Sequence, residues 1–146
     1  MRIFLFALTA LFSGCGSYGL DATDTGAMAS QLGIDPLGEI DFGAHDLGAP
    51  KSARTDVVMF VDGEQPLAII DVFLEGGSSD IFSLSDELPL PLLLQPGVDF
   101  PVSLRFSPDT SGTFRGELTV MIDDGTDDGS YINRPIVGEG CTDSDC

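Results

Sequence analysis

The sequence has few basic residues, no tryptophan and a single histidine. Its 146 residues carry 6 Lys and Arg against 24 Asp and Glu, which gives a formal net charge of -18 and a pI of about 4.1. Binding through the phosphates of nucleic acid requires Lys and Arg to replace condensed counterions, so we exclude nucleic acid as a partner. Hydrophobic residues still make up 42% of the chain, which is enough for one packed core.

The N-terminal apolar run is too short to cross a bilayer. It covers residues 3–12 (IFLFALTALF) and follows Arg2, whereas a membrane-spanning helix needs about 20 residues. A short apolar run behind a positive charge is typical of a secretory signal, which is removed. We therefore predict that residues 1–14 are a signal peptide.

A cysteine follows this run almost at once. Ser13 and Gly14 precede Cys15, and the arrangement resembles the bacterial lipobox, in which the thiol is diacylglycerylated and becomes the mature N-terminus. Phe12 departs from that pattern, where Leu is usual. The resemblance implies a lipoprotein that Cys15 anchors in a membrane through palmitate-type chains, and Gly16 in place of Asp favours the outer membrane, on its periplasmic or its outer face. The alternative is an ordinary secretory signal that contains a cysteine.

Two further cysteines lie in the acidic C-terminal tail, residues 141–146. Cys141 and Cys146 form an even pair, and in an oxidising compartment such a pair predicts a disulfide. Free thiols or an intermolecular bond are an alternative. A zinc site is a third, but it needs more N or S ligands, and the single histidine, His45, is far away in the sequence.

The segment after the lipid-bearing cysteine lacks a regular pattern. Residues 15–39 are rich in Gly, Asp, Thr, Ala and Ser, with no sustained period of 3.6 or 2. This composition predicts a flexible linker that holds the folded part away from the membrane. A helical turn on contact is the alternative for residues 28–34.

Beyond residue 39, apolar residues recur with period two. Phe100, Val102, Leu104 and Phe106 alternate with polar or solvent-tolerant residues, which predicts a half-buried strand. Similar patterns predict strands at residues 39–47, 55–61, 68–75, 81–84, 117–123 and 131–137. Because turn residues separate these runs, we predict a seven-stranded antiparallel immunoglobulin-like β-sandwich over residues 40–140.

Several short motifs follow one another along this region. They are Ile40-Asp41-Phe42-Gly43, Gly63-Glu64-Gln65-Pro66-Leu67, Leu94-Gln95-Pro96-Gly97, Phe106-Ser107-Pro108 with Gly112, Gly116-Glu117-Leu118 and Gly138-Glu139-Gly140. Together they resemble the bacterial choice-of-anchor D domain, which is similar to the abnormal-spindle and Hydin type of immunoglobulin-like domain and related to the major sperm protein and PapD-type chaperones. Asp62 departs from the usual Asn, and the acidic loop before the last strand is longer. The resemblance implies a non-catalytic domain that serves as a structural spacer or as a protein-interaction domain, in which case it contacts an envelope or surface protein through a strand edge or the loops at one end.

An acidic loop, residues 123–130, is the candidate metal site. Asp123, Asp124, Asp127 and Asp128 supply the oxygen ligands that Ca²⁺ prefers. An EF-hand register fails, because Pro135 stands where a bidentate Glu is needed. A solvated hairpin loop is the alternative interpretation. The loop therefore carries the second functional hypothesis, a calcium-responsive adhesion or binding module.

Catalytic patterns are weak in this sequence. His45 stands beside Asp46 without a Ser or Cys nucleophile near it in the sequence, and the Gly-x-Ser-x-Gly and His-Glu-x-x-His patterns are absent. We therefore predict no enzyme activity, with a hydrolase as the alternative. The run LPLPLLL at residues 88–94 is interpreted as an edge strand or, alternatively, as an exposed segment for a partner.

Overall fold

Nine β-strands make up the described part of the protein. The computed structural model describes residues 29–49, 52–76, 80–125, 128–142 and 146. Its strands are β1 (Gln31–Asp35), β2 (Ile40–Asp46), β3 (Ala53–Asp62), β4 (Leu67–Glu75), β5 (Phe82–Leu84), β6 (Leu92–Leu94), β7 (Phe100–Phe106), β8 (Gly112–Asp123) and β9 (Ser130–Cys141). Within these ranges, no helix has the length and apolar character to span a membrane.

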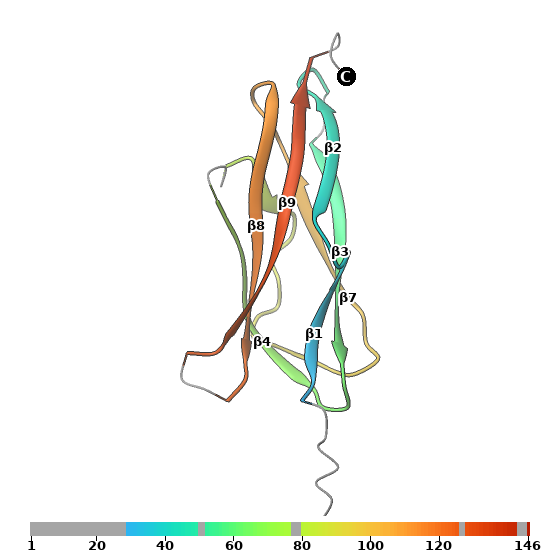
Figure 1. The fold of residues 1–146 in the computed structure, drawn as a ribbon, viewed down its shortest axis with the longest axis vertical. Coiled ribbons are helices and arrows are strands. Elements are labelled where there is room, and N and C mark those ends of the chain that lie inside the picture. Colours follow the sequence, from blue (N-terminus) through green and yellow to red (C-terminus); the bar gives the residue numbers. More distant parts are fainter. Residues whose placement is uncertain (1–28, 50–51, 77–79, 126–127, 143–145) are drawn as a thin grey trace, which may run out of the picture.

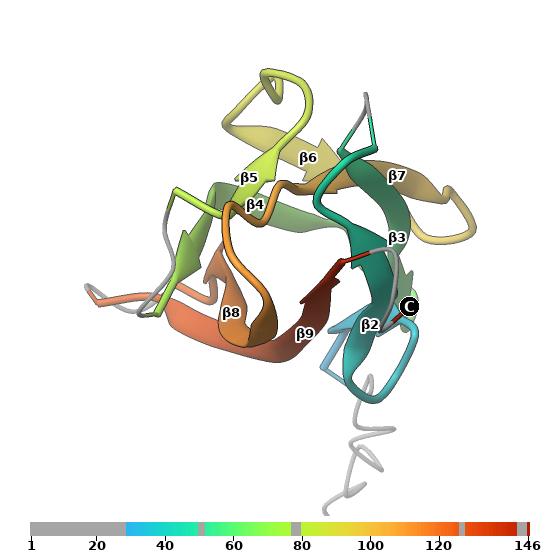
Figure 2. The ribbon, with the colours of Figure 1, turned by 90° about the horizontal axis from the view of Figure 1, so that it is seen from above.

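The strands form two sheets that face each other across one core (Figure 1, Figure 2). Sheet A has the order β1-β3-β7-β5, and sheet B has the order β2-β9-β8-β4-β6. The immunoglobulin-like β-sandwich predicted from the sequence is confirmed. Two details differ from the prediction: the described residues form nine strands where seven were expected, and β2 pairs with β9 in parallel where an antiparallel pairing was expected.

The strand β1 lies inside the segment predicted to be a linker. It pairs antiparallel with β3, and its Leu32 and Ile34 are buried, with 6% and 0% of their surface exposed. At its start, the Ser30 hydroxyl accepts a hydrogen bond from the Gln65 backbone N–H at 2.8 Å. The linker prediction is therefore wrong for residues 31–35, and so is the helical turn proposed there, because period-two burial of two side chains against β3 stabilises a strand.

The chain passes from one sheet to the other between β1 and β2. β1 is the edge of sheet A, and β2 is the edge of sheet B beside β9, so one continuous segment closes the same side of both sheets (Figure 1). Ile40, at the start of β2, is fully buried and lies opposite Ile136. The sandwich therefore begins at residue 31, before the boundary at residue 40 that the sequence predicted.

The edge-strand interpretation of residues 88–94 is confirmed for residues 92–94. β6 lies at the edge of sheet B and pairs with β4. Leu94 is buried, whereas Leu93 is 58% exposed on the outer face. Pro89 and Pro91 precede the strand and leave its backbone donors intact.

Phe106 is the centre of the aromatic part of the core. Its side chain is fully buried. Its ring centroid lies 5.0 Å from Phe82, 5.5 Å from Phe42, 6.0 Å from Phe114 and 6.3 Å from His45. These neighbours come from both sheets, so the ring joins the two layers. Aromatic pairs at such separations add to the free energy gained by burial.

Truncation of this ring tests its role in stability. We expect Phe106→Ala to lower the free energy of unfolding by about 3–5 kcal/mol, because it removes a buried ring and leaves a cavity. The measurement is urea denaturation followed by circular dichroism. The control is Tyr131→Ala, since Tyr131 is 56% exposed and its removal is expected to cost about 0.5 kcal/mol or less. Similar losses for the two variants would contradict the central position of Phe106.

Candidate functional site

An open groove lies on the outer face of sheet A. It has a volume of about 430 Å³ and is lined by Asp35, Leu37, Val58, Phe60 and Asp99. These residues come from the end of β1 and the segment after it, from β3, and from the position just before β7. Segments far apart in the sequence therefore build the groove only once sheet A has formed.

The apolar floor of the groove follows from the alternation of side chains along β3. Val57, Met59 and Val61 face the core, with 0%, 0% and 7% of their surface exposed. Because successive side chains of a strand point to opposite faces, Val58 and Phe60 lie on the outer face of the sheet. They are partly buried there, so the strand carries apolar residues on both faces.

A glycine in β1 allows Phe60 to lie across its neighbouring strand. Gly33 is paired with Phe60 in the register of β1 with β3. A Cβ atom added at Gly33 would overlap the Phe60 ring, so the ring occupies the space that any other residue would fill. The Phe60 ring therefore extends the floor of the groove from β3 over β1.

Two carboxylates give the groove its charge. Asp35 is paired with Val58 across the strands, and Asp99 precedes β7. None of the described residues that line the groove is Lys or Arg. The ion pairs of the described residues engage other carboxylates, with Arg54 2.9 Å from Asp86 and Arg115 3.0 Å from Glu39. The groove is thus apolar at its floor and negative at its sides.

Sequence reasoning missed all five residues that line the groove. One signal was present: residues 57–61 (VVMFV) are apolar at every position, whereas a strand with a solvated outer face alternates apolar and polar residues. An unbroken apolar run in a sheet with one solvated face indicates apolar residues on its outer surface. Asp35 and Asp99 lie beside these apolar residues because of the register between strands. No pattern in the nearby sequence predicts that position.

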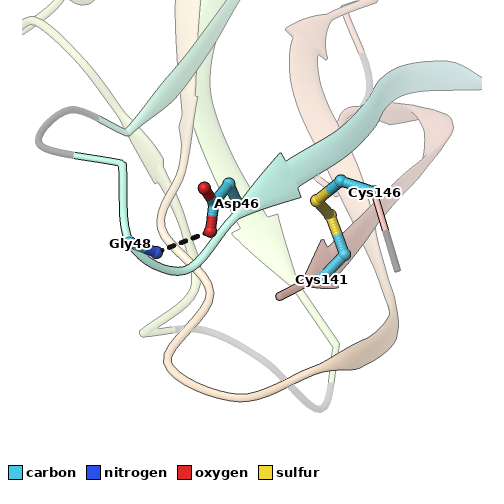
Figure 3. Close-up of a disulfide and its surroundings, with 4 residues drawn as sticks. All are labelled: Asp46, Gly48, Cys141 and Cys146. Atoms are coloured by element: carbon cyan, nitrogen blue, oxygen red, sulfur yellow. Dashed lines mark hydrogen bonds between the residues drawn. A yellow bond between two sulfur atoms is a disulfide. The ribbon is translucent and has the colours of Figure 1, made fainter. Parts of the chain in front are cut away.

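The two C-terminal cysteines are joined by a disulfide (Figure 3). Cys141 is the last residue of β9 and is 3% exposed, and its Cα lies 5.5 Å from that of Cys146. The Cys141 carbonyl accepts a hydrogen bond from the Leu47 N–H at 2.9 Å, just beyond β2. The disulfide therefore holds the end of the chain near the end of the parallel β2–β9 pair.

The candidate catalytic histidine packs against the core. His45 lies in β2 opposite Gly140, and its ring centroid is 6.3 Å from that of Phe106 in an edge-to-face orientation. Its neighbour Asp46 accepts a hydrogen bond from the Gly48 N–H at 2.8 Å (Figure 3). His45 and Asp46 are therefore both engaged in contacts within the fold at the edge of sheet B.

The acidic loop forms the turn between β8 and β9. The Asp123 carboxylate accepts a hydrogen bond from the Gly125 N–H at 2.9 Å, and the Ser130 hydroxyl donates to Asp124. Gly125 and Gly129 have positive φ, of 82° and 63°, as a tight reversal requires. The described residues contain no group of three or more His, Cys, Asp or Glu placed to hold a metal ion.

Two of the residues predicted to have a function lie outside the described ranges. Asp127 belongs to the candidate calcium site, and Cys15 is the predicted lipid attachment point, preceded by the predicted signal peptide. The lipid anchor and the calcium site therefore stay predictions.

Solved structures of low sequence identity have a similar fold. The ASH or PapD-like domain 7 of human CEP192 aligns with a TM-score of 0.50 at 11% identity, over 97% of this chain and 99% of that one. The VesB protease of Vibrio cholerae gives 0.57 at 14% identity, over 75% of this chain and 32% of the protease. A protein of unknown function from Porphyromonas gingivalis W83 gives 0.55 at 13% identity, over 79% of this chain and 49% of that one.

These likenesses concern the fold alone. The chain spans less than half of the VesB protease and of the Porphyromonas gingivalis protein, and fold similarity at such identities does not transfer an activity. No family model and no curated protein matches the chain. The similarity to a PapD-like domain agrees with an immunoglobulin-like sandwich of the type that the sequence motifs suggested.

Substitution at Gly33 tests the construction of the groove floor. We expect Gly33→Ala to displace the Phe60 ring and to lower the free energy of unfolding by about 1 kcal/mol, because the new methyl group overlaps the ring and the ring, on the outer face, can move aside. Gly38→Ala is the matched control, since a Cβ at Gly38 meets no atom within 4 Å. Urea denaturation measures both. Adding Phe60→Leu to Gly33→Ala is expected to recover part of the loss, and equal losses at Gly33 and Gly38 would contradict the contact.

Thermal unfolding with and without calcium tests the acidic loop. We expect the midpoint to be the same in EDTA and in millimolar Ca²⁺, because Asp123 and Asp124 already accept hydrogen bonds from their own loop. A ligand that binds only the folded state raises stability with its concentration. A higher midpoint in Ca²⁺, abolished by Asp127→Asn, would contradict this expectation and support the calcium-responsive module.

Proposed function

We propose that the protein is a non-catalytic, lipid-anchored component of a bacterial cell envelope whose immunoglobulin-like sandwich binds another envelope or surface protein. The observation that carries the binding role is the open apolar groove on sheet A. Leu37, Val58 and Phe60 lie there beside two carboxylates, and an apolar pocket with a few polar groups is the first candidate for a binding site. The fold similarity to a PapD-like domain is compatible with a structural or interaction domain.

The anchor rests on the sequence around Cys15. Ser13, Gly14 and Cys15 follow a ten-residue apolar run that is preceded by Arg2, with Gly16 next in the chain. Two or more acyl chains on one cysteine provide stable membrane attachment, since each buried CH₂ contributes about 0.8 kcal/mol. With Gly16 after the cysteine, we propose the outer membrane as the location.

The arrangement of the sandwich suits an anchor that precedes β1. β1 begins at the end of the molecule where β8 turns into β9, and the C-terminus lies at the opposite end (Figure 1). The end that carries the acidic turn is therefore the one to which the anchoring segment connects. With a net charge of -18, the protein is repelled by anionic headgroups, so the body stands away from the bilayer.

Lipid labelling tests the anchor. We expect cells that express the full chain to incorporate radioactive palmitate into the protein, and we expect Cys15→Ala to lose the label almost completely, because the acceptor thiol is gone. Cys146→Ala is the matched control, since it removes a cysteine outside the predicted attachment site and is expected to retain the label. Equal labelling of Cys15→Ala and the wild type would contradict the lipid anchor.

A further inference from the structure

We propose that the groove on sheet A binds a short segment of a partner protein in which one Arg or Lys is flanked by apolar residues. This inference rests on the proposed function and specifies the chemistry of the partner. It depends on two features that occur together at one place: an apolar floor on the outer face of the sheet, and a pair of carboxylates beside it.

The apolar residues of the groove provide contact area for the partner. Val58 and Phe60 form the floor, and Leu37, which is 73% exposed, stands at its side. A single exposed leucine is common on protein surfaces. Here it borders a groove of about 430 Å³ whose floor is also apolar, so a bound segment would cover all three side chains at once.

The carboxylates define the charge of the partner. Asp35 and Asp99 line the groove, and the lining residues that the structure describes include no Lys or Arg. An Arg or Lys side chain has an apolar stem and a charged end, so its stem would lie on Val58 and its charge would reach the carboxylates. The Phe60 ring adds a face on which a cation is attracted.

The rest of sheet A limits the length of the basic segment. On the same outer face, Arg54 lies opposite Arg105 in the register of β3 with β7, and the Ser103 hydroxyl donates to Asp56. A uniformly basic segment that ran along β3 would find Asp86 already paired with Arg54 and a second guanidinium group, Arg105, opposite it, so further basic residues would gain less there than at the groove. The face therefore favours one basic residue at the groove over a long polycation.

A metal ion fits this site less well than a basic side chain. Ca²⁺ takes six to eight oxygen ligands in general, whereas the groove offers two carboxylates. The described residues include no group of three or more candidate metal ligands. The net charge of -18 also attracts a basic partner and raises the rate of encounter with it.

Peptide titration tests the inference directly. The probe is an acetylated, amidated peptide, Gly-Leu-Arg-Leu-Gly, added to the full chain in mild detergent while methyl and aromatic NMR signals are recorded. We expect the signals of Leu37, Val58 and Phe60 to shift with millimolar or tighter affinity, and we expect affinity to fall as salt is raised. The same peptide with citrulline in place of Arg keeps the shape and removes the charge, and it is expected to bind about three- to fivefold more weakly.

Paired variants separate the groove from the overall charge of the protein. Asp35→Asn with Asp99→Asn is expected to reduce affinity for the Arg peptide about three- to fivefold. Glu87→Gln with Asp109→Asn removes the same charge elsewhere and is expected to change the affinity less than about 1.5-fold. Leu37→Ala is expected to weaken binding, and Leu93→Ala, an exposed leucine on sheet B, is the matched control.

Several results would overturn the inference. They are the absence of shifts at millimolar peptide, equal binding of the Arg and citrulline peptides, and equal effects of the two double variants. None of these results affects palmitate labelling at Cys15, and loss of that label does not affect peptide binding. The experiments therefore distinguish an error in the proposed peptide binding from an error in the proposed lipid anchor.

Discussion

Alternation of side chains along β3 is the constraint on which both the core and the groove depend. Val57, Met59 and Val61 fill the space between the sheets, and Val58 and Phe60 lie on the outside. A shift of the strand by one residue would exchange the two sets. The burial that stabilises the sandwich therefore also fixes the apolar floor of the groove, so the surface needs no separate stabilising element.

The edges of the sheets complete this arrangement. β1 lies at the edge of sheet A beside β3, where its Gly33 packs against the Phe60 ring and its Asp35 lines the groove, while β2 continues the chain into sheet B beside β9. The opposite edges consist of β5 and β6, each of three residues. Short edge strands offer few free backbone groups for pairing with other chains, so these two edges are poor sites for the addition of a strand.

Much of the fold could be predicted from the sequence, because most strands contain their own periodic signal. β7 alternates over its whole length, and its predicted bounds match the structure. β1 has only two apolar residues that face the core, Leu32 and Ile34, so its composition resembles that of a linker. Its pairing with β3 decides its conformation. The parallel pairing of β2 with β9 and the placement of Asp35 and Asp99 at one groove depend on contacts between distant parts of the chain, for which a single sequence carries no local pattern.

The most direct test of this account is the position of the Phe60 ring relative to Gly33 in solution. The measurement is a nuclear Overhauser spectrum of the full chain labelled at its aromatic rings. We expect strong cross-peaks between the Phe60 ring protons and the α-protons of Gly33, with none from Phe60 to the Phe106 ring. Cross-peaks between Phe60 and Phe106, with those to Gly33 absent, would place Phe60 in the core and contradict both the register of β3 and the existence of the groove.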